Sequence, residues 1–382
     1  MISPEELKRL RKELHAYPEV SGKEDKTARR IKKWLGALHP DRIISGIGGY
    51  GVAAVFGKPG SAPNIMFRCE LDALPIEETN DFSHRSKHAY VSHKCGHDGH
   101  MAILLGLAAQ LADERPEQGC VTLLFQPAEE TGTGADLVLA DKKFRELEPD
   151  YIFALHNLPG FKKNSIILRH GSFSSASIGM IMKLTGRSSH ASEPEKGINP
   201  APAVAQIIKD FYSLIENRAL FRDFTLGTII HARIGEVAFG TNPGNALIMA
   251  TLRAYLNEDL ELLRKKTAEI AEKAADEGQL SFEKQWTEEF RAYDNDSLCV
   301  DMIEQIAETH GLEITRPEHP FRWSEDFAHF LERYKGAMFG LGAGMDHPAV
   351  HSPDYDYPDD ITETGIRMFS GIYKRLLKRK DK

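Results

Sequence analysis

The first half of the chain alternates short apolar runs with helical segments, and this alternation constrains the fold more than any other feature. The runs cover residues 52–56, 65–69, 121–125 and 151–155. Runs of this length, bounded by Gly and Pro, are typical of buried strands. Residues 5–38 show helical periodicity with a break at Pro18, and residues 101–111 are apolar almost all round. The pattern predicts a mostly parallel sheet with helices on both faces.

A different pattern begins near residue 178. Strand-like and helical segments follow in the order β-α-β-β-α-β, at residues 178–185, 201–216, 224–233, 245–255, 259–276 and 280–290. This order is typical of a ferredoxin-like sandwich. A helix at 296–310 and a strand at 337–341 then resume the first pattern. We therefore predict an α/β fold with a discontinuous domain, residues 1–176 and 292–382, and an inserted α+β domain, residues 177–291.

The composition agrees with a folded protein of more than one core. The chain has 382 residues, more than the roughly 150 of one typical core. Lys and Arg number 48 against 56 Asp and Glu, and this net charge of −8 argues against nucleic acid as a partner. The four scattered cysteines exclude a disulfide scaffold, and no apolar run approaches the roughly 18 residues of a membrane span. The first residues resemble a capped helix and not a signal peptide, so we expect a cytoplasmic protein without membrane contact.

Residues 93–100, His-Lys-Cys-Gly-His-Asp-Gly-His, are the strongest signal for a metal site. Three histidines, a cysteine and an aspartate directly precede the apolar helix. The spacing of Cys95 and His97 lets a thiolate and an imidazole converge from one turn. We expect Asp98 to hold a ligand imidazole by its other nitrogen. A capped, polar helix start is the alternative, but the apolar helix that follows favours a metal site.

Two adjacent acids, Glu129 and Glu130, follow the strand-like run 121–125. Adjacent carboxylates normally indicate a solvated turn, but two unpaired charges at the end of a buried strand are costly. A nearby cation removes that cost. Because neighbouring side chains point in different directions, one acid can bind metal while the other faces the bound water as a general base.

Three further polar residues are ambiguous by themselves. Asp72 follows a strand-like run, where an acid is at least as often a turn or cap residue as a functional one. His156 follows another such run, and His351 lies in the string His347–Ser352. A lone histidine in such a place is more often structural than a ligand. These two gain weight because the other clusters lack enough ligands for two metals.

At these residues the chain resembles the M20 metallopeptidases, in particular the amidohydrolase branch with N-acyl-amino-acid amidohydrolases, hippurate hydrolases and N-acetyldiaminopimelate deacetylases. The matching strings, in family order over residues 14–358, are CELDALPIEE, HKCGHDGHMAILLG, LLFQPAEETGTGA, ALHNLPG, GRSSHASEPEKGINPA, SEDFAHF and HPAVHSPDYD. The resemblance implies a metal-dependent exopeptidase-like catalytic domain and an inserted lid or dimerisation domain. It also implies two divalent metal ions and a small N-acyl amino acid substrate, and the mixed thiolate, imidazole and carboxylate set suits Zn, Mn, Co or Ni. A homodimer through the inserted domain is a further expectation, because its outer strand offers an edge for pairing.

The resemblance further implies the roles of single residues. The positions that match the family's metal ligands are Cys95, His97, Glu130, His156 and His351, and the Cys95 thiolate is able to bridge. Glu129 matches the general base, and Asp72 matches the acid that orients a ligand or tunes the base. His190 lies on a string that in relatives reaches the substrate, sometimes from the partner subunit. Asn245 and Arg253 match contacts to polar groups of the substrate.

Two positions depart from the commonest form of the family pattern. Cys69-Glu70 replaces Ala-Asp, and Lys94 replaces a small residue before Cys95. None of these three is a proposed ligand, and we expect Cys69 to be a core residue.

The expected reaction is hydrolysis of an N-acyl amino acid, in particular an N-acetyl one. Glu129 would act as base, and His190 together with a metal would stabilise the oxyanion. The nearest alternative is a dipeptidase or aminopeptidase of another M20 branch, whose members carry an aspartate where this chain has Cys95. The string Gly132-Thr133-Gly134 suggests a nucleotide-binding oxidoreductase as an alternative from another class. This signal is weak because a full GxGxxG after the strand is lacking. A non-catalytic binding protein is disfavoured because Glu129 and every ligand are present. The acyl group, the amino acid and the metal stay open.

Overall fold

The computed structural model describes residues 2–58, 60 and 62–377, and the chain divides into two compact units. The larger unit contains the described residues up to Phe173, Tyr293–His319, and those from Glu325 onward. The smaller unit contains Ser174–Ala292 and the short segment Pro320–Ser324. The assignment of catalytic and lid roles to these units stays a prediction.

A sheet of eight strands forms the larger unit, in the order β1-β2-β4-β3-β5-β16-β6-β15. The neighbours β4, β3, β5 and β16 run parallel, whereas β1 and β2 pair antiparallel at one edge. The strands are β1 Arg42–Ile47, β2 Gly51–Gly57, β3 Asn64–Glu70, β4 Cys120–Gln126, β5 Tyr151–Pro159, β6 Ile166–Ile167, β15 Ile314–Thr315 and β16 Lys335–Gly344. The predicted fold class, a mostly parallel α/β sheet, is confirmed. The sequence pattern missed β1 because this edge strand is mostly half-exposed and lacks an apolar run.

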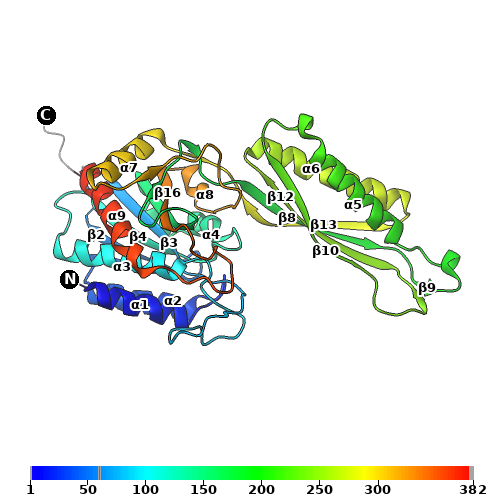
Figure 1. Cartoon of the computed structure of the whole chain (residues 1–382), viewed down its shortest axis with the longest axis horizontal. Coiled ribbons are helices and arrows are strands. Elements are labelled where there is room, and N and C mark those ends of the chain that lie inside the picture. Colours follow the sequence, from blue (N-terminus) through cyan, green and yellow to red (C-terminus); the bar gives the residue numbers. More distant parts are fainter. Residues whose placement is uncertain (1, 59, 61, 378–382) are drawn as a thin grey trace. The chain divides into compact units, whose positions relative to one another are not determined.

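The helix α3 is apolar on nearly all sides because other elements surround it. It packs on β3 and contacts both α1 and α9, which flank it in Figure 1. The helices of this unit are α1 Pro4–Ala16, α2 Asp25–Ala37, α3 His97–Asp113, α4 Gly134–Ala140, α7 Ser297–Thr309, α8 Ala328–Leu331 and α9 Thr362–Leu377. Within the described part of the chain, no helix has the length and apolar character needed to cross a membrane.

The smaller unit contains a four-stranded antiparallel sheet in the order β10-β12-β8-β13, on which α5 and α6 pack (Figure 1). Its elements are β8 Ala176–Thr185, α5 Ala201–Glu216, β10 Thr225–Ile234, β12 Asn245–Ala254, α6 Asn257–Glu277 and β13 Ser281–Phe290. Buried and more exposed residues alternate along β12, since one face of the sheet meets the helices. A separate pair, β9 Ser189–His190 and β11 Thr241–Asn242, forms a small ribbon.

The parallel strands place the candidate residues at one edge of the larger sheet. Asp72 follows the end of β3, Glu129 follows the end of β4, and His156 lies in the carboxyl-terminal half of β5. Because the carboxyl ends of parallel strands meet at the same edge, open α/β sheets bind their ligands there. The start of α3 adds Cys95 and His97 to this edge.

Candidate metal centre

Cys95 and His97 lie at the start of α3, where Gly96 lets the backbone turn into the helix. Gly96 has a φ of 93°, a region that favours glycine. A Cβ at this position would lie 2.0 Å from Asn157 Oδ1 and 2.9 Å from Tyr355 Oη, so a larger residue would clash with both of these side chains. The turn thereby brings Cys95 Sγ to 3.3 Å from His156 Nε2.

The five predicted metal ligands converge in the larger unit. Ligand atoms of Cys95, His97 and His156 lie within 4.8 Å of one another, and so do those of Cys95, Glu130 and His351. His97 Nε2 lies 3.8 Å from Glu130 Oε1, and His351 Nε2 lies 3.6 Å from Glu130 Oε2. Two groups of three that share Cys95 form a donor set that would suit two cations.

The polar atoms of this cluster favour bound cations. His97 Nε2 and Glu130 Oε1 are buried without a hydrogen-bond partner among the described residues, and such atoms call for an ion or a water. Burial lowers the pKa of His97, but Glu70 and Asp72 outweigh it and raise this pKa to about 10. The surroundings therefore attract positive charge. The mixed set of thiolate, imidazole and carboxylate fits zinc, manganese, cobalt or nickel.

Glu129 lies beside the ligand cluster and is only 5% exposed. Its Oε2 lies 3.9 Å from His97 Nε2. The preceding residue, Ala128, has a φ of 54° and donates its N–H to Glu24 Oε1 at 2.8 Å, which fixes the turn. Burial, and then repulsion from Glu325, raises the pKa of Glu129 well above its usual range. A carboxylate in such surroundings takes up a proton readily, as a general base does.

Asp72 connects two of the candidate ligands. Its backbone carbonyl lies 2.9 Å from His97 Nδ1, an arrangement that leaves Nε2 for a metal. Its Oδ2 accepts hydrogen bonds from the Glu130 N–H at 3.0 Å and from Ser21 Oγ at 2.7 Å. Asp72 thereby contacts both His97 and Glu130.

The expectation for Asp98 is wrong. Its Oδ2 lies 2.8 Å from His15 Nδ1 and 3.4 Å from Arg11 Nη1, so it faces α1 and holds no ligand imidazole. The reason is helical geometry: consecutive residues of a helix point about 100° apart, so Asp98 turns away from the cluster that His97 faces. Neither Arg11 nor His15 was predicted to be a partner of Asp98. The only local signal was a pair of basic residues on a helix that also carries an apolar stripe.

The His15 contacts predict a pH-dependent contribution to stability. Burial lowers the pKa of His15, but Asp98 and Glu78 raise it overall from 6.5 to about 9. A raised folded-state pKa means that this stabilisation is full below pH 6.5 and disappears as the pH rises through about 9. We expect His15→Asn to lower the free energy of unfolding by roughly 3 kcal/mol at most near neutral pH, and by less in alkali. Urea denaturation of both proteins across this range tests it; a difference that does not shrink in alkali contradicts the assignment.

A second buried network lies behind Glu129 and was also missed. The Arg68 side chain is fully buried, and its Nη2 lies 2.9 Å from Glu325 Oε1 and 2.5 Å from Asp326 Oδ1. Its Nη1 also bonds Glu70, whose Oε2 lies 2.6 Å from His100 Nδ1. The neighbouring Cys69 belongs to the hydrophobic core.

The three candidate substrate residues all lie in the smaller unit. His190 is exposed on β9, and its Nδ1 lies 2.6 Å from Ser192 Oγ. Asn245 and Arg253 are on β12, eight residues apart, and therefore share the sheet face that the helices leave open. Arg253 Nη1 donates to Ser324 Oγ at 3.0 Å.

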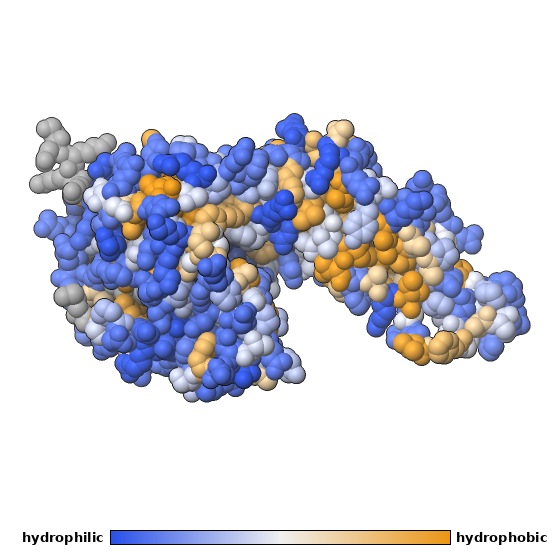
Figure 2. Space-filling model, in the orientation of Figure 1, coloured by the Kyte–Doolittle hydropathy of each residue, from blue (hydrophilic) through white to orange (hydrophobic). Residues whose placement is uncertain are grey.

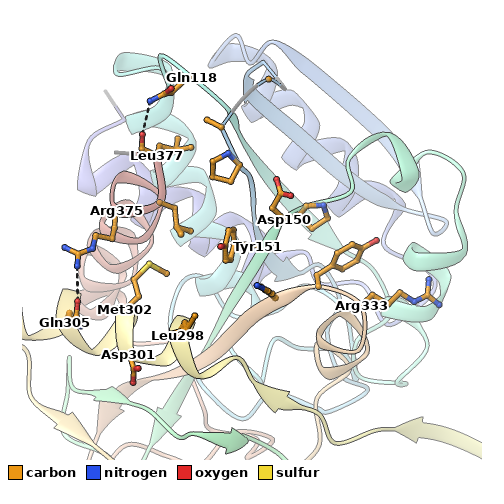
Figure 3. A pocket seen from close by; sticks show the side chains of 17 residues that line it. Gln118, Asp150, Tyr151, Leu298, Asp301, Met302, Gln305, Arg333, Arg375 and Leu377 are labelled. Carbon is orange, nitrogen blue, oxygen red and sulfur yellow. Dashed lines mark hydrogen bonds between the residues drawn. The ribbon is translucent and has the colours of Figure 1, made fainter. Parts of the chain in front are cut away.

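A broad pocket of about 1230 Å³ lies elsewhere in the larger unit (Figure 3). Tyr151 and Lys335, the first residues of β5 and β16, line it, together with Leu298 and Met302 of α7. It therefore opens at the amino ends of these strands, whereas the ligand cluster lies at their carboxyl ends. None of the candidate site residues is among those that line it.

Comparisons with known sequences identify the family of the chain. Residues 66–375 match Peptidase family M20/M25/M40. An N-acetyl-L-cysteine deacetylase from Bacillus subtilis is 29% identical over 378 residues, 97% of this chain and 87% of the relative. A hippurate hydrolase from Campylobacter jejuni is 29% identical over 375 residues, 98% of this chain and 97% of the relative.

Solved structures show the same architecture. A dinuclear metal binding peptidase from Bacillus subtilis has a TM-score of 0.80 at 25% identity, over 98% of both chains. An aminobenzoyl-glutamate utilization protein from Klebsiella pneumoniae shares the fold with a TM-score of 0.74 at 20% identity, over 95% of this chain and 94% of that one. The similarity therefore includes the residues of both units.

Proposed function

Because the chain belongs to peptidase family M20/M25/M40 and is a metal-dependent amidohydrolase of that family, we propose that it hydrolyses the amide bond of N-acyl amino acids. N-acetyl amino acids are the first candidates, and the products are a carboxylate and a free amino acid. The observation that carries the proposal is the buried Glu129 beside a five-residue ligand cluster. The names of the deacetylase and hippurate hydrolase relatives support the substrate class.

Two ion positions follow from the ligand groups. Cys95, His97 and His156 would hold one ion, and Glu130 and His351 would hold the other together with the Cys95 thiolate. When bound, two divalent ions would supply Lewis-acid polarisation of the amide carbonyl and would lower the pKa of water toward ~7.

The protein's own residues would move the proton and orient the ligands. Glu129 would accept a proton from the attacking water and deliver it to the departing amine. Asp72 would keep His97 and Glu130 in place through the contacts described above. Arg253 and Asn245 would contact polar groups of the substrate, and His190 would stabilise the oxyanion.

The experiment is a hydrolysis screen with the Zn-, Mn-, Co- or Ni-loaded protein. N-acetyl and N-benzoyl amino acids are compared with dipeptides and with the corresponding amino-acid amides, and release of the free amine is measured. We expect the acyl amino acids to be hydrolysed best. Preferential cleavage of dipeptides would support a peptidase of another M20 type, against which Cys95 argues.

We also propose that the smaller unit forms a homodimer through β10. This strand lies at an edge of its sheet, and edge strands offer unpaired backbone groups. Ile230 is 61% exposed, and Val237 and Phe239 after the strand are fully exposed. Hydrophobic side chains gather on this unit in Figure 2. Patches of this kind often mark protein contacts.

Light scattering tests the dimer. We expect the wild type to have the mass of two chains and Ile230→Lys to have the mass of one, because a buried unpaired charge opposes association. Tyr212→Lys, an exposed position on α5, is the matched control and should remain dimeric. A monomeric wild type would exclude the proposal.

A further inference from the structure

We propose that the buried ion pair of Lys94 and Glu78 positions the metal centre, by holding the loop that carries His351 against the start of α3. This inference rests on the proposed function, because it takes Cys95 and His351 to be ligands of a common ion. Lys94 and Glu78 are positioning residues, since neither belongs to the ligand cluster.

Lys94 contacts the His351 loop at two points. Its side chain is fully buried, and Nζ donates to the backbone carbonyl of Tyr355 at 2.7 Å. Its own carbonyl accepts the N–H of His351 at 2.6 Å. Lys94, which directly precedes Cys95 in the chain, therefore bonds both the candidate ligand His351 and Tyr355, four positions later.

Glu78 keeps the ammonium group in place. Its Oε1 accepts from Lys94 Nζ at 2.6 Å and lies 3.0 Å from His15 Nε2, and its Oε2 accepts the N–H of Ser86 at 2.7 Å. Glu78 is 3% exposed. A buried ion pair persists only when further hydrogen bonds satisfy both groups. This carboxylate has them, so Glu78 is a fixed anchor for the ammonium of Lys94.

The conformation of His351 makes such an anchor necessary. His351 has a φ of 65°, in the left-handed region that non-glycine residues rarely adopt. Such a conformation persists only when the surrounding structure enforces it. The side chain is 50% exposed, so burial contributes little to holding it. The bond from its N–H to the Lys94 carbonyl, and the bond from the Lys94 ammonium to the Tyr355 carbonyl, are among the interactions that hold the backbone of this loop.

Tyr355 extends the effect to a third ligand segment. Its Oη accepts a hydrogen bond from Asn157 Nδ2 at 2.8 Å, and Asn157 follows His156 in β5. Lys94 thus lies where three ligand-bearing segments meet. Lysine at this position departs from the small residue of the resembled family pattern, so the ion pair is a feature of this chain that the pattern does not contain.

The test is a Co²⁺ titration of Lys94→Met, a variant that keeps the apolar stem and removes the ammonium. We expect the wild type to bind two equivalents, and the variant to bind one of them about 10–100-fold more weakly, the usual loss when a residue that supports a ligand is removed. Metal content after dialysis and the thiolate-to-cobalt absorption are the readouts. In Lys94→Met, the thiolate-to-cobalt absorption should persist at one equivalent of cobalt, because Cys95 still lies beside His97 and His156.

Two further variants separate positioning from stability. Lys94→Met removes the ammonium from the buried Glu78 carboxylate, and loss of one partner of a buried ion pair can unfold the protein. In Lys94→Met/Glu78→Gln the carboxylate charge is removed as well, so we expect stability to recover in part while the weak ion stays weak. Lys162→Met breaks an ion pair of equal length, 2.6 Å, whose side chains are 69% and 55% exposed, and should bind cobalt as the wild type does.

Each outcome supports or overturns the positioning role of Lys94 or the proposed function. Two ions bound by the double variant with wild-type affinity would overturn the positioning role. Fewer than two ions on the wild type would overturn both this inference and the proposed metal centre. Two ions on the wild type, a weak second ion in the variants, and no hydrolysis of any acyl amino acid would support positioning and reject the substrate class.

Discussion

Glu129→Gln is expected to lower kcat by about 10²–10⁴-fold while the protein still binds two metal ions. The amide has nearly the shape of the carboxylate but cannot accept the proton of the attacking water. Glu129 is 5% exposed and its Oε2 lies 3.9 Å from His97 Nε2, so the substituted side chain lies directly beside the ligand cluster. Steady-state kinetics and metal content of the purified variant are the measurements.

The neighbouring acid provides the matched control. Glu130→Gln should lose metal as well as activity, since Glu130 shares a ligand group with Cys95 and His351. The two variants differ by one position but should differ in metal content. Near-normal turnover by Glu129→Gln would exclude Glu129 as the base, and loss of metal from that variant would assign it a ligand role.

Arg68→Met is expected to lower the free energy of unfolding by about 3–5 kcal/mol, the usual result of removing one partner of a buried ion pair. The methionine fills much of the space but leaves Glu70, Glu325 and Asp326 without their shared cation. Urea denaturation in the presence of a chelator, monitored by circular dichroism, measures the change in the free energy of unfolding without a contribution from bound metal.

Arg42→Met is the control for this second prediction. Arg42 and Glu146 also form a close ion pair, but their side chains are 49% and 61% exposed. Exposed pairs contribute about 0–1 kcal/mol, so this variant should unfold almost as the wild type does. Equal effects of the two substitutions would show that the buried network does not depend on Arg68.

Several elements of the fold were predictable because their sequence patterns are local. The strand-like runs 65–69, 121–125 and 151–155 correspond to β3, β4 and β5. Each is a continuous apolar run, since a strand covered on both faces excludes polar residues. The edge strand β1 and the two-residue strands such as β6 and β15 were missed. Strands that are half-exposed or only two residues long do not need a continuous apolar run.

Part of the candidate site was predictable for the same reason. Cys95 and His97 are separated by one residue, and Glu129 and Glu130 are adjacent, so short strings reveal them. His156 and His351 are single histidines far apart in the sequence, so they gained weight only from the need for more ligands and from the family resemblance. The partner of Asp98 could not be predicted: His15 lies 83 residues earlier, and which helix faces Asp98 depends on how α1 packs against α3.

The sequence by itself determined the α/β class, the family and the residue types of the candidate metal cluster, because apolar periodicity and closely spaced candidate ligands are properties of short segments. Only the tertiary structure decided which buried charges pair. Arg68 meets Asp326 across 258 positions, and Lys94 meets Glu78 and the carbonyl of Tyr355. A buried charge must find an opposite charge or a hydrogen-bond partner, but packing of distant segments chooses which one. The cluster around Cys95 was therefore visible in the sequence, whereas the residues that hold it in place were not.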